Sequence, residues 1–249
     1  MPPTVSGDFL GRCGVRRGDD FSPGGRKIPN VFSSQHEILP SFDSRESLPR
    51  MSRELHACLI RYFARLDRLD EKWKDLSKRA ERPLQVLANR TEQLRHVMNE
   101  ETDEAEDSVD RETRGRLIFK ILMGLEEEVV LLRDILTQFN DANQDLKNHL
   151  VNLENARSKV SLNDETILEL FRETPYRPKL ELLLQWAVEG FQFYHNMYLR
   201  ISDCMKSIDY KVEETIDNLV SSFTEEKRGR KNINRILAFT QFLAKETLH

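Results

Sequence analysis

Three stretches of the chain place apolar residues at alternating spacings of four and three positions. An average repeat of 3.5 residues keeps one stripe of side chains facing a neighbouring helix along its whole length, as in supercoiled helices. The stretches run through Leu55, Leu59, Tyr62, Leu66, Leu69, Trp73, Leu76 and Ala80; through Ile118, Leu122, Leu125, Val129, Leu132, Leu136, Phe139, Asn143, Leu146, Leu150 and Leu153; and through Leu180, Leu184, Ala187, Phe191, Tyr194, Tyr198, Ile201, Met205, Ile208 and Val212. The pattern predicts three long helices that pack against other helices.

Breaks in the pattern set the expected ends of these helices. The first is predicted over 51–81, after which Pro83 either opens a new helix as its first residue or kinks a continuous one. Residues 100–112 hold eight carboxylates in thirteen positions with little apolar content, so an acidic loop is predicted there. The second helix is expected over about 114–160 and the third over about 180–212.

The predicted fold class is all-α: an elongated antiparallel helical bundle of long coiled-coil-like helices with a short C-terminal helix. Residues 1–49 combine Gly, Pro, Ser and Arg with few regularly spaced apolar groups, so their burial cannot offset the entropy of ordering. We expect a disordered N-terminal tail over 1–49 and a helical bundle domain over 50–249. The sequence leaves open whether translation starts at Met1 or at Met51, which directly precedes the first repeat.

The apolar arc of the second helix changes along its length. In the first half Leu117, Ile121, Leu131 and Ile135 widen the stripe beyond the repeat positions, and a wide arc predicts cover by several helices. In the second half the arc narrows to a two-helix seam. Asn143 occupies a seam position, where a polar side chain either fixes the register at some cost in stability or marks a solvated point.

The third helix carries a second apolar stripe beside its repeat, formed by Leu183, Trp186, Phe193, Met197 and Cys204. The combined arc is about 160° wide at 100° per residue, which is too wide for one neighbouring helix. The helix therefore either forms the centre of the chain's own bundle or offers part of the stripe to another protein. In the second case Trp186, Phe193 and Met197 are the partner-binding residues, whereas Tyr198 in the repeat belongs to the core. Gly190 lies in the stripe, where another backbone could approach closely.

Gly229 is predicted to interrupt the C-terminal part before a last short amphipathic helix. The apolar residues of that helix are Ile233, Ile236, Leu237, Phe239, Phe242 and Leu243. Lys227, Arg228, Arg230 and Lys231 surround the glycine in the predicted loop. This basic cluster is either solvated, recognised by a nuclear import receptor, or in contact with phosphate groups.

Composition narrows the functional classes. The net charge of −4 gives no global reason to expect nucleic acid or an anionic membrane as a partner. The histidines and the three cysteines are scattered, and the glycines are not followed by a Lys-Ser/Thr pair, so we expect no metal, no cofactor and no enzymatic activity. Few dispersed cysteines favour a reducing compartment, and no apolar run reaches the roughly 18 residues of a spanning helix. We expect a soluble intracellular protein.

The third predicted helix also resembles that of a known family. Trp186, Tyr194, Tyr198-Leu199, Arg200 and then Ser207-Ile208 reproduce, without gaps, the pattern of the AIRIM family of ribosome maturation factors. Weaker similarities are Trp73 followed by Pro83-Leu84 and Glu92-Gln93-Leu94, and Phe242-Leu243 with Glu246. The resemblance covers roughly residues 54–247, and both the tail 1–49 and the acidic loop depart from the pattern.

The resemblance implies a non-enzymatic adaptor subunit that partners the small protein CINP and docks on a hexamer of AFG-type AAA+ ATPases. Such an assembly remodels late pre-ribosomal particles of the large subunit in the cytoplasm and also removes replication proteins from chromatin. The implied localisation is cytoplasmic and nuclear. Contact with pre-ribosomal particles would be indirect, and neither a membrane partner nor direct nucleic-acid binding is expected.

Two other classes are open on the residues alone. A coiled-coil structural protein, of the kinetochore or vesicle-tether type, would self-associate through the same helices and have no role in ribosome biogenesis. An RNA-binding protein that used the cluster from Lys227 to Lys231 would show an affinity that falls steeply with salt.

Overall fold

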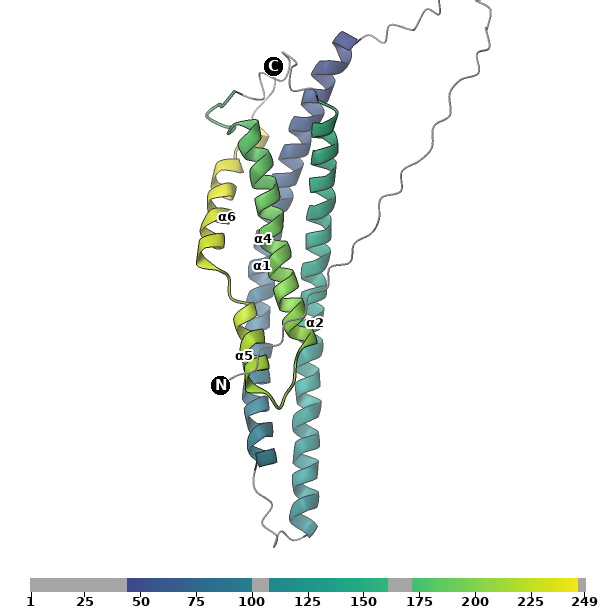
Figure 1. The fold of residues 1–249 in the computed structure, drawn as a ribbon, viewed down its shortest axis with the longest axis vertical. Coiled ribbons are helices and arrows are strands. Elements are labelled where there is room, and N and C mark those ends of the chain that lie inside the picture. Colours follow the sequence, from purple (N-terminus) through teal and green to yellow (C-terminus); the bar gives the residue numbers. More distant parts are fainter. Residues whose placement is uncertain (1–43, 100–107, 161–171, 246–249) are drawn as a thin grey trace, which may run out of the picture. The chain divides into compact units, whose positions relative to one another are not determined.

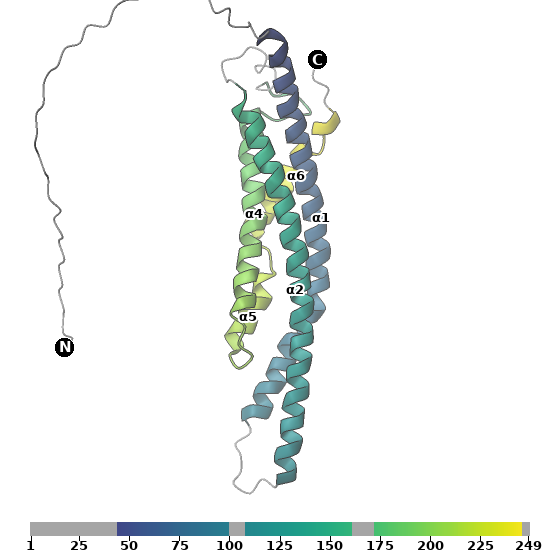
Figure 2. The same cartoon turned by 90° about the vertical axis from the view of Figure 1, so that its right-hand side faces the viewer.

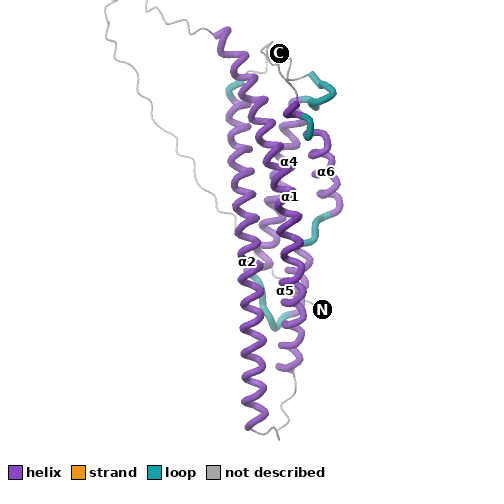
Figure 3. Tube along the Cα trace, turned by 180° about the vertical axis from the view of Figure 1, so that it is seen from behind, coloured by secondary structure: helices purple, strands orange, loops and turns teal. Residues whose placement is uncertain are grey.

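The computed structural model describes residues 44–99, 108–160 and 172–245, and within these ranges its named elements are all helices (Figure 3). They are α1 (Ser44–Asn99), α2 (Ser108–Ser158), α4 (Leu180–Lys206), α5 (Glu213–Ser222) and α6 (Lys227–Thr240), followed by the 3₁₀ turn η1 (Leu243–Lys245). The predicted all-α bundle is confirmed. Over the same ranges, no helix combines the length and the hydropathy that a membrane-spanning segment needs.

Two long helices, α1 and α2, run side by side in opposite directions (Figure 1). All repeat residues of α1 from Leu55 to Ala80 are buried, so the first repeat does mark the packed face. The helix begins at Ser44, before its expected start, and continues through Pro83, which is the second of the two predicted alternatives. Figure 2 shows its axis changing direction in the last third, as expected where a proline cannot donate its backbone hydrogen bond.

The end of the predicted acidic loop is helical. Residues 100–107 lie outside the described residues, as do residues 1–43 of the predicted tail, whereas α2 already begins at Ser108. Asp110 and Glu112 are therefore helical, contrary to the predicted loop over 100–112. Carboxylates in the first turns of a helix interact favourably with the positive end of its dipole. Glu112 also forms an ion pair with Arg116, one turn later, at 2.5 Å.

Helix α4 packs on α1 and α2 with a register that differs from the predicted one. Its fully buried residues are Leu180, Leu183, Trp186, Ala187, Gly190, Tyr194, Met197, Ile201 and Ser202. The repeat positions Leu184, Phe191 and Tyr198 are only half-buried, so the buried face of α4 lies between the repeat and the second stripe and includes residues of both. A Cβ atom at Gly190 would lie 2.9 Å from Cδ2 of Leu66, so the close approach is to a side chain of α1 and not to a backbone.

The third predicted helix ends earlier than its apolar repeat. The N–H of Ser207 bonds to the carbonyl oxygens of Asp203 and Cys204 at 3.2 Å each, and the chain then leaves the helix. Ile208 and Val212, the last residues of the repeat, lie in the connection to α5. The hydroxyl of Thr215 closes this connection with a 2.8 Å bond to the carbonyl of Asp209. Local side-chain hydrogen bonds thus replace the helical ones.

Helix α6 lies along α4 on the side away from α2 (Figure 1). It begins at Lys227, so Gly229 lies inside the helix and the predicted interruption falls instead at residues 223–226. A Cβ atom at Gly229 would lie 2.6 Å from Cε2 of Phe193. The glycine therefore lets two helices approach closely, and its lack of a side chain serves packing rather than a break.

Asn143 lies in the interior of the bundle, with 1% of its surface exposed. Its Nδ2 donates to the backbone carbonyl of Tyr194 at 3.4 Å, which links α2 to α4. The interpretation of this seam position as a solvated point is therefore wrong. A buried amide that bonds to one particular carbonyl fits the alternative, a residue that fixes the register between two helices.

Candidate functional site

Of the residues predicted to bind a partner, Trp186 and Phe193 contact α6, and Met197 is buried. Trp186 and Met197 are each 4% exposed, and Phe193 is half-buried. The rings of Trp186 and Phe239 lie with their centroids 5.8 Å apart. The chain's own C-terminal helix thus covers this part of the wide arc of α4. Of the two predicted alternatives, the structure agrees with the one that places α4 at the centre of the chain's own bundle. The exposed surface predicted at this stripe is absent from the structure.

Cations of α6 also lie over the aromatic rings of α4. The guanidinium of Arg235 is 5.9 Å from the ring centre of Trp186, and that of Arg230 is 5.8 Å from the ring centre of Phe193. Such cation–π contacts stabilise by about 0.5 to 1 kcal/mol where water reaches them. They hold α6 in place over the stripe.

A polar cluster in the interior joins α1, α4 and α6. The hydroxyl of Tyr194 donates to Oδ1 of Asp70 at 2.5 Å, and Nη1 of Arg230 bonds to the same oxygen. Arg230 also donates through Nη2 to Glu225 at 2.7 Å, and Nε1 of Trp73 donates to the same carboxylate at 2.7 Å. Buried charges are tolerated only when they are paired and hydrogen-bonded, and this cluster meets both conditions.

The titration of these groups reflects their pairing. Burial by itself raises the pKa of Asp70, but hydrogen bonds from Lys74, Tyr194 and Arg230 outweigh it, so its pKa lies below the ordinary value. Burial and the neighbouring Asp70 carboxylate raise the pKa of Tyr194. Burial lowers the pKa of Arg230, yet its hydrogen bonds to Glu225 and Asp70 raise it overall. At neutral pH the cluster therefore holds a charged carboxylate, a neutral phenol and a charged guanidinium.

An apolar surface that the sequence reasoning missed lies on the outward side of α2. We call Phe119, Met123 and Val130 the α2 outer stripe; they are 63%, 50% and 57% exposed. Spacings of four and seven residues place the three side chains within about 40° of each other on the helix. This spacing was visible in the sequence as a second apolar row, about 120° round the helix from the repeat. Large exposed side chains in one row indicate a surface that binds another molecule.

The stripe is open because few elements reach this part of α2. The connection between α4 and α5 contacts α2 at Glu126, where the hydroxyl of Tyr210 donates to the carboxylate at 2.8 Å. The hairpin of α1 and α2 extends beyond that connection (Figure 2). Cover by several helices, predicted from the wide arc, is wrong in part. Ile121 and Ile135 are buried, whereas the other two residues that widen the arc, Leu117 and Leu131, are about half exposed.

The predicted basic cluster is divided between the interior and the surface. Arg230 points inward to the polar cluster, whereas Lys227, Arg228 and Lys231 are exposed in the first turns of α6. All four residues are helical, so the predicted loop does not exist. Arg235, which the sequence reasoning did not connect with the cluster, lies one turn after Lys231 on the exposed side of α6.

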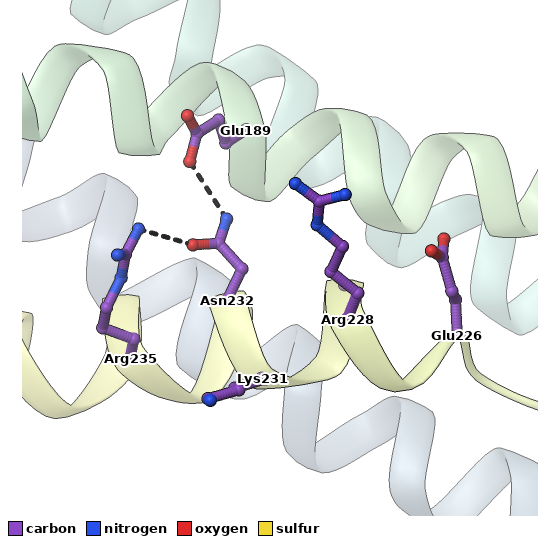
Figure 4. A pocket seen from close by; sticks show the side chains of 7 residues that line it. Glu189, Glu226, Arg228, Lys231, Asn232 and Arg235 are labelled. Carbon is purple, nitrogen blue, oxygen red and sulfur yellow. Dashed lines mark hydrogen bonds between the residues drawn. The ribbon is translucent and has the colours of Figure 1, made fainter.

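Three of these cations line a groove of about 860 Å³ between α6 and α4 (Figure 4). Arg228 and Arg235 point towards the groove, and Lys231 lies on the outer side of α6. Asn232 connects the two walls, because its Nδ2 donates to Glu189 at 3.0 Å and its Oδ1 accepts from Arg235 at 2.7 Å. Glu226 also lines the groove. Cationic and amide donors predominate there, which suits an anionic ligand.

Comparison with known proteins identifies a family. The family model described as "Ribosome biogenesis protein C1orf109-like" matches residues 53–242, which include α2, α4, α5 and α6 and all of α1 except its start, but not η1. No curated protein matches the chain. The match agrees with the resemblance of Trp186, Tyr194 and Tyr198 to the AIRIM family, and it covers more than half of the sequence. The chain therefore belongs to the C1orf109-like family of ribosome biogenesis proteins, the AIRIM family.

Proposed function

We propose that this chain is a non-enzymatic adaptor subunit in the maturation of the large ribosomal subunit, which binds a helical partner similar to CINP and docks on a hexamer of AFG-type AAA+ ATPases. The observation that carries the proposal is the α2 outer stripe. It leaves Phe119, Met123 and Val130 open to solvent, the first two on the part of the hairpin that extends beyond the connection between α4 and α5. Membership of a ribosome biogenesis family supports the biological setting.

The chemistry of the stripe suits a helix as the bound partner. Aromatic residues and methionine are enriched in protein interfaces, and a row at spacings of four and seven matches the seam of a packed helix pair. Glu126 and Glu127 lie between the apolar side chains and are exposed, which would favour a partner with basic residues beside its apolar seam. A second helix on α2 would thus continue the bundle beyond the end of α4.

The polar cluster supports a structural rather than a catalytic role for the buried charges. Asp70, Tyr194 and Arg230 bond to one another between three helices, and none of them lines the groove between α6 and α4. A catalytic acid or base must instead reach a bound substrate. We expect the purified chain, alone, neither to bind nor to hydrolyse ATP.

The test is affinity purification of the tagged full chain from cells, followed by mass spectrometry. We expect the AAA+ ATPase and a small helical protein in the recovered complex, and the same complex in cytoplasmic and nuclear fractions. The double substitution Phe119→Ser and Met123→Ser should remove both proteins without lowering the melting temperature, since both side chains are exposed. Recovery of a self-sufficient homodimer without the ATPase would favour the structural coiled-coil alternative.

A further inference from the structure

The exposed side of α6 carries four cations in a row. We call Lys227, Arg228, Lys231 and Arg235 the α6 basic face. The helix from Lys227 to Thr240 contains neither aspartate nor glutamate. In the described part of the chain, no ion pair joins any of the four cations to a carboxylate. Within the described residues, therefore, no carboxylate forms an ion pair with these charges.

The stability of the free protein does not explain this arrangement. Lys227 and Lys231, and then Lys231 and Arg235, are like-charge pairs one turn apart, and such pairs destabilise a helix. Lys227 and Arg228 also lie in the first turn, where the helix dipole favours anions over cations. A bound polyanion would remove both unfavourable terms, because its charges would lie between the cations and at the positive end of the dipole.

An exposed aromatic side chain lies beside the row. Phe239 is 57% exposed, and both its ring and the guanidinium of Arg235 lie against Trp186. Cations that follow a backbone, together with an aromatic ring that can stack on a base, are the two components of single-stranded nucleic-acid sites. From Lys227 to Arg235 the row is about 12 Å long at 1.5 Å per residue, enough for about three phosphates.

We infer that the α6 basic face binds single-stranded RNA, with phosphates on Lys227, Arg228, Lys231 and Arg235 and one base stacked on Phe239. The inference rests on the proposed role in ribosome biogenesis, where the remodelled particle contains RNA. It replaces the expectation that direct nucleic-acid binding is absent, and it favours the RNA-binding alternative for the cluster from Lys227 to Lys231.

An acidic protein segment would suit this face less well. Protein interfaces are depleted in lysine and centre on buried apolar residues, whereas nucleic-acid interfaces are polar and strongly positive. The face from Lys227 to Arg235 has no apolar side chain among its cations. Two carboxylates line the same groove. Glu189 already accepts hydrogen bonds from Asn232 and Gln185, and Glu226 lies directly before the first residue of α6. RNA would therefore lie along the open edge of the groove, towards which Arg228 and Arg235 point and beside which Lys231 lies.

The experiment is fluorescence anisotropy of a labelled uridine oligomer of about 12 nucleotides with the purified full chain, at salt concentrations from about 50 to about 200 mM. The double substitution Lys227→Ala and Lys231→Ala should weaken binding by about tenfold or more. It should also make the negative slope of log K against log salt less steep by about 1.4, since each lost phosphate contact on a single strand contributes about 0.7. Lys78→Ala with Lys147→Ala is the matched control, because both lysines are exposed on α1 and α2 and the change in net charge is equal. Phe239→Ala should weaken binding but keep the slope.

The inference is overturned if the wild-type chain does not bind the oligomer at low salt, or if both lysine pairs change binding equally. It is also overturned if polyglutamate binds more tightly than the oligomer, which would assign the face to an acidic protein. Co-purification of the AAA+ ATPase distinguishes a failure of the RNA-binding inference from a failure of the proposed function. The Lys227 and Lys231 variant should still recover the ATPase, whereas the Phe119 and Met123 variant should lose it and keep RNA binding.

Discussion

Tyr194 and Asp70 are 124 positions apart in the sequence, yet the tyrosine hydroxyl donates to the aspartate carboxylate at 2.5 Å. Because Arg230 bonds to the same oxygen, one buried carboxylate connects α1, α4 and α6. This contact fixes the C-terminal helix over the aromatic residues of α4. The arrangement of α6, and with it the α6 basic face, depends on this cluster.

Replacing Asp70 with asparagine should destabilise the protein by about 3 kcal/mol. The amide keeps the shape and can still accept from Tyr194, but the charge of Arg230 loses a buried partner. Urea denaturation measures the change in the free energy of unfolding. Asp75→Asn on the same helix is the control, because that carboxylate is 70% exposed and its ion pair with Arg79 spans 3.9 Å, so we expect little change. Equal effects of the two substitutions would contradict the role of the cluster.

The contribution of Asp70 should depend on pH in a defined direction. Its pKa is lower in the folded than in the unfolded protein, where an aspartate titrates near about 3.9. The folded state therefore binds this proton less tightly, so the stabilisation is complete above the unfolded pKa and is lost as pH falls through the folded pKa. The stability difference between wild type and Asp70→Asn should be constant from about pH 7 to about pH 5 and shrink below about pH 4. A difference that grows in acid would refute this assignment.

Periodicity predicted which helices form but not how each is rotated. The repeat through Leu55, Leu66 and Trp73 is the buried face of α1, as expected. In α4 two apolar stripes lie next to each other, and the repeat alone could not show that α6 would fold back over the one that contains Trp186. That contact depends on residues about 50 positions later in the chain, such as Phe239.

This rotation reverses the expected effects of two aromatic substitutions. Trp186 is 4% exposed beneath α6, so Trp186→Ala should cost about 3 to 5 kcal/mol through lost contacts and a cavity. Tyr198 is half-buried and contacts Phe139 at one edge, with ring centroids 6.3 Å apart, so Tyr198→Ala should cost less. Circular dichroism melts of both variants measure the order. A larger loss for Tyr198→Ala would show that α4 is rotated as its repeat predicts.

Two glycines provide a matched test of packing at α6. A Cβ atom at Gly115 in α2 would meet no atom within 4 Å, so Gly115→Ala should stabilise by up to about 1 kcal/mol through helix propensity. Gly229→Ala gains the same propensity but brings a methyl against the Phe193 ring, and overpacking typically costs about 1 to 3 kcal/mol. We expect a net loss of about 1 kcal/mol in urea denaturation. Stabilisation by both substitutions would mean that α6 does not lie against Phe193.

The candidate sites were predictable only where the signal is local. The basic residues around Gly229 were visible in the sequence, but their division was not, because Asp70, a partner of Arg230, lies 160 positions earlier in the chain. Asp70 and Glu225 are separated by more than 150 positions, and no spacing rule connects them. The α2 outer stripe had a local signal in the spacing of Phe119, Met123 and Val130. This signal was missed because the repeat on another side of the same helix is longer and more regular.

The most direct test of the adaptor role uses two valines on the same helix. Val130 lies in the α2 outer stripe and is 57% exposed, whereas Val151 lies near the other end of α2 and is 44% exposed. Each is replaced by aspartate in the tagged full chain, and the AAA+ ATPase and helical partner that co-purify are quantified. Neither change should lower the melting temperature by much, since both side chains face solvent. The proposal predicts that Val130→Asp removes most of both proteins while Val151→Asp retains them; equal recovery with the two variants would contradict it.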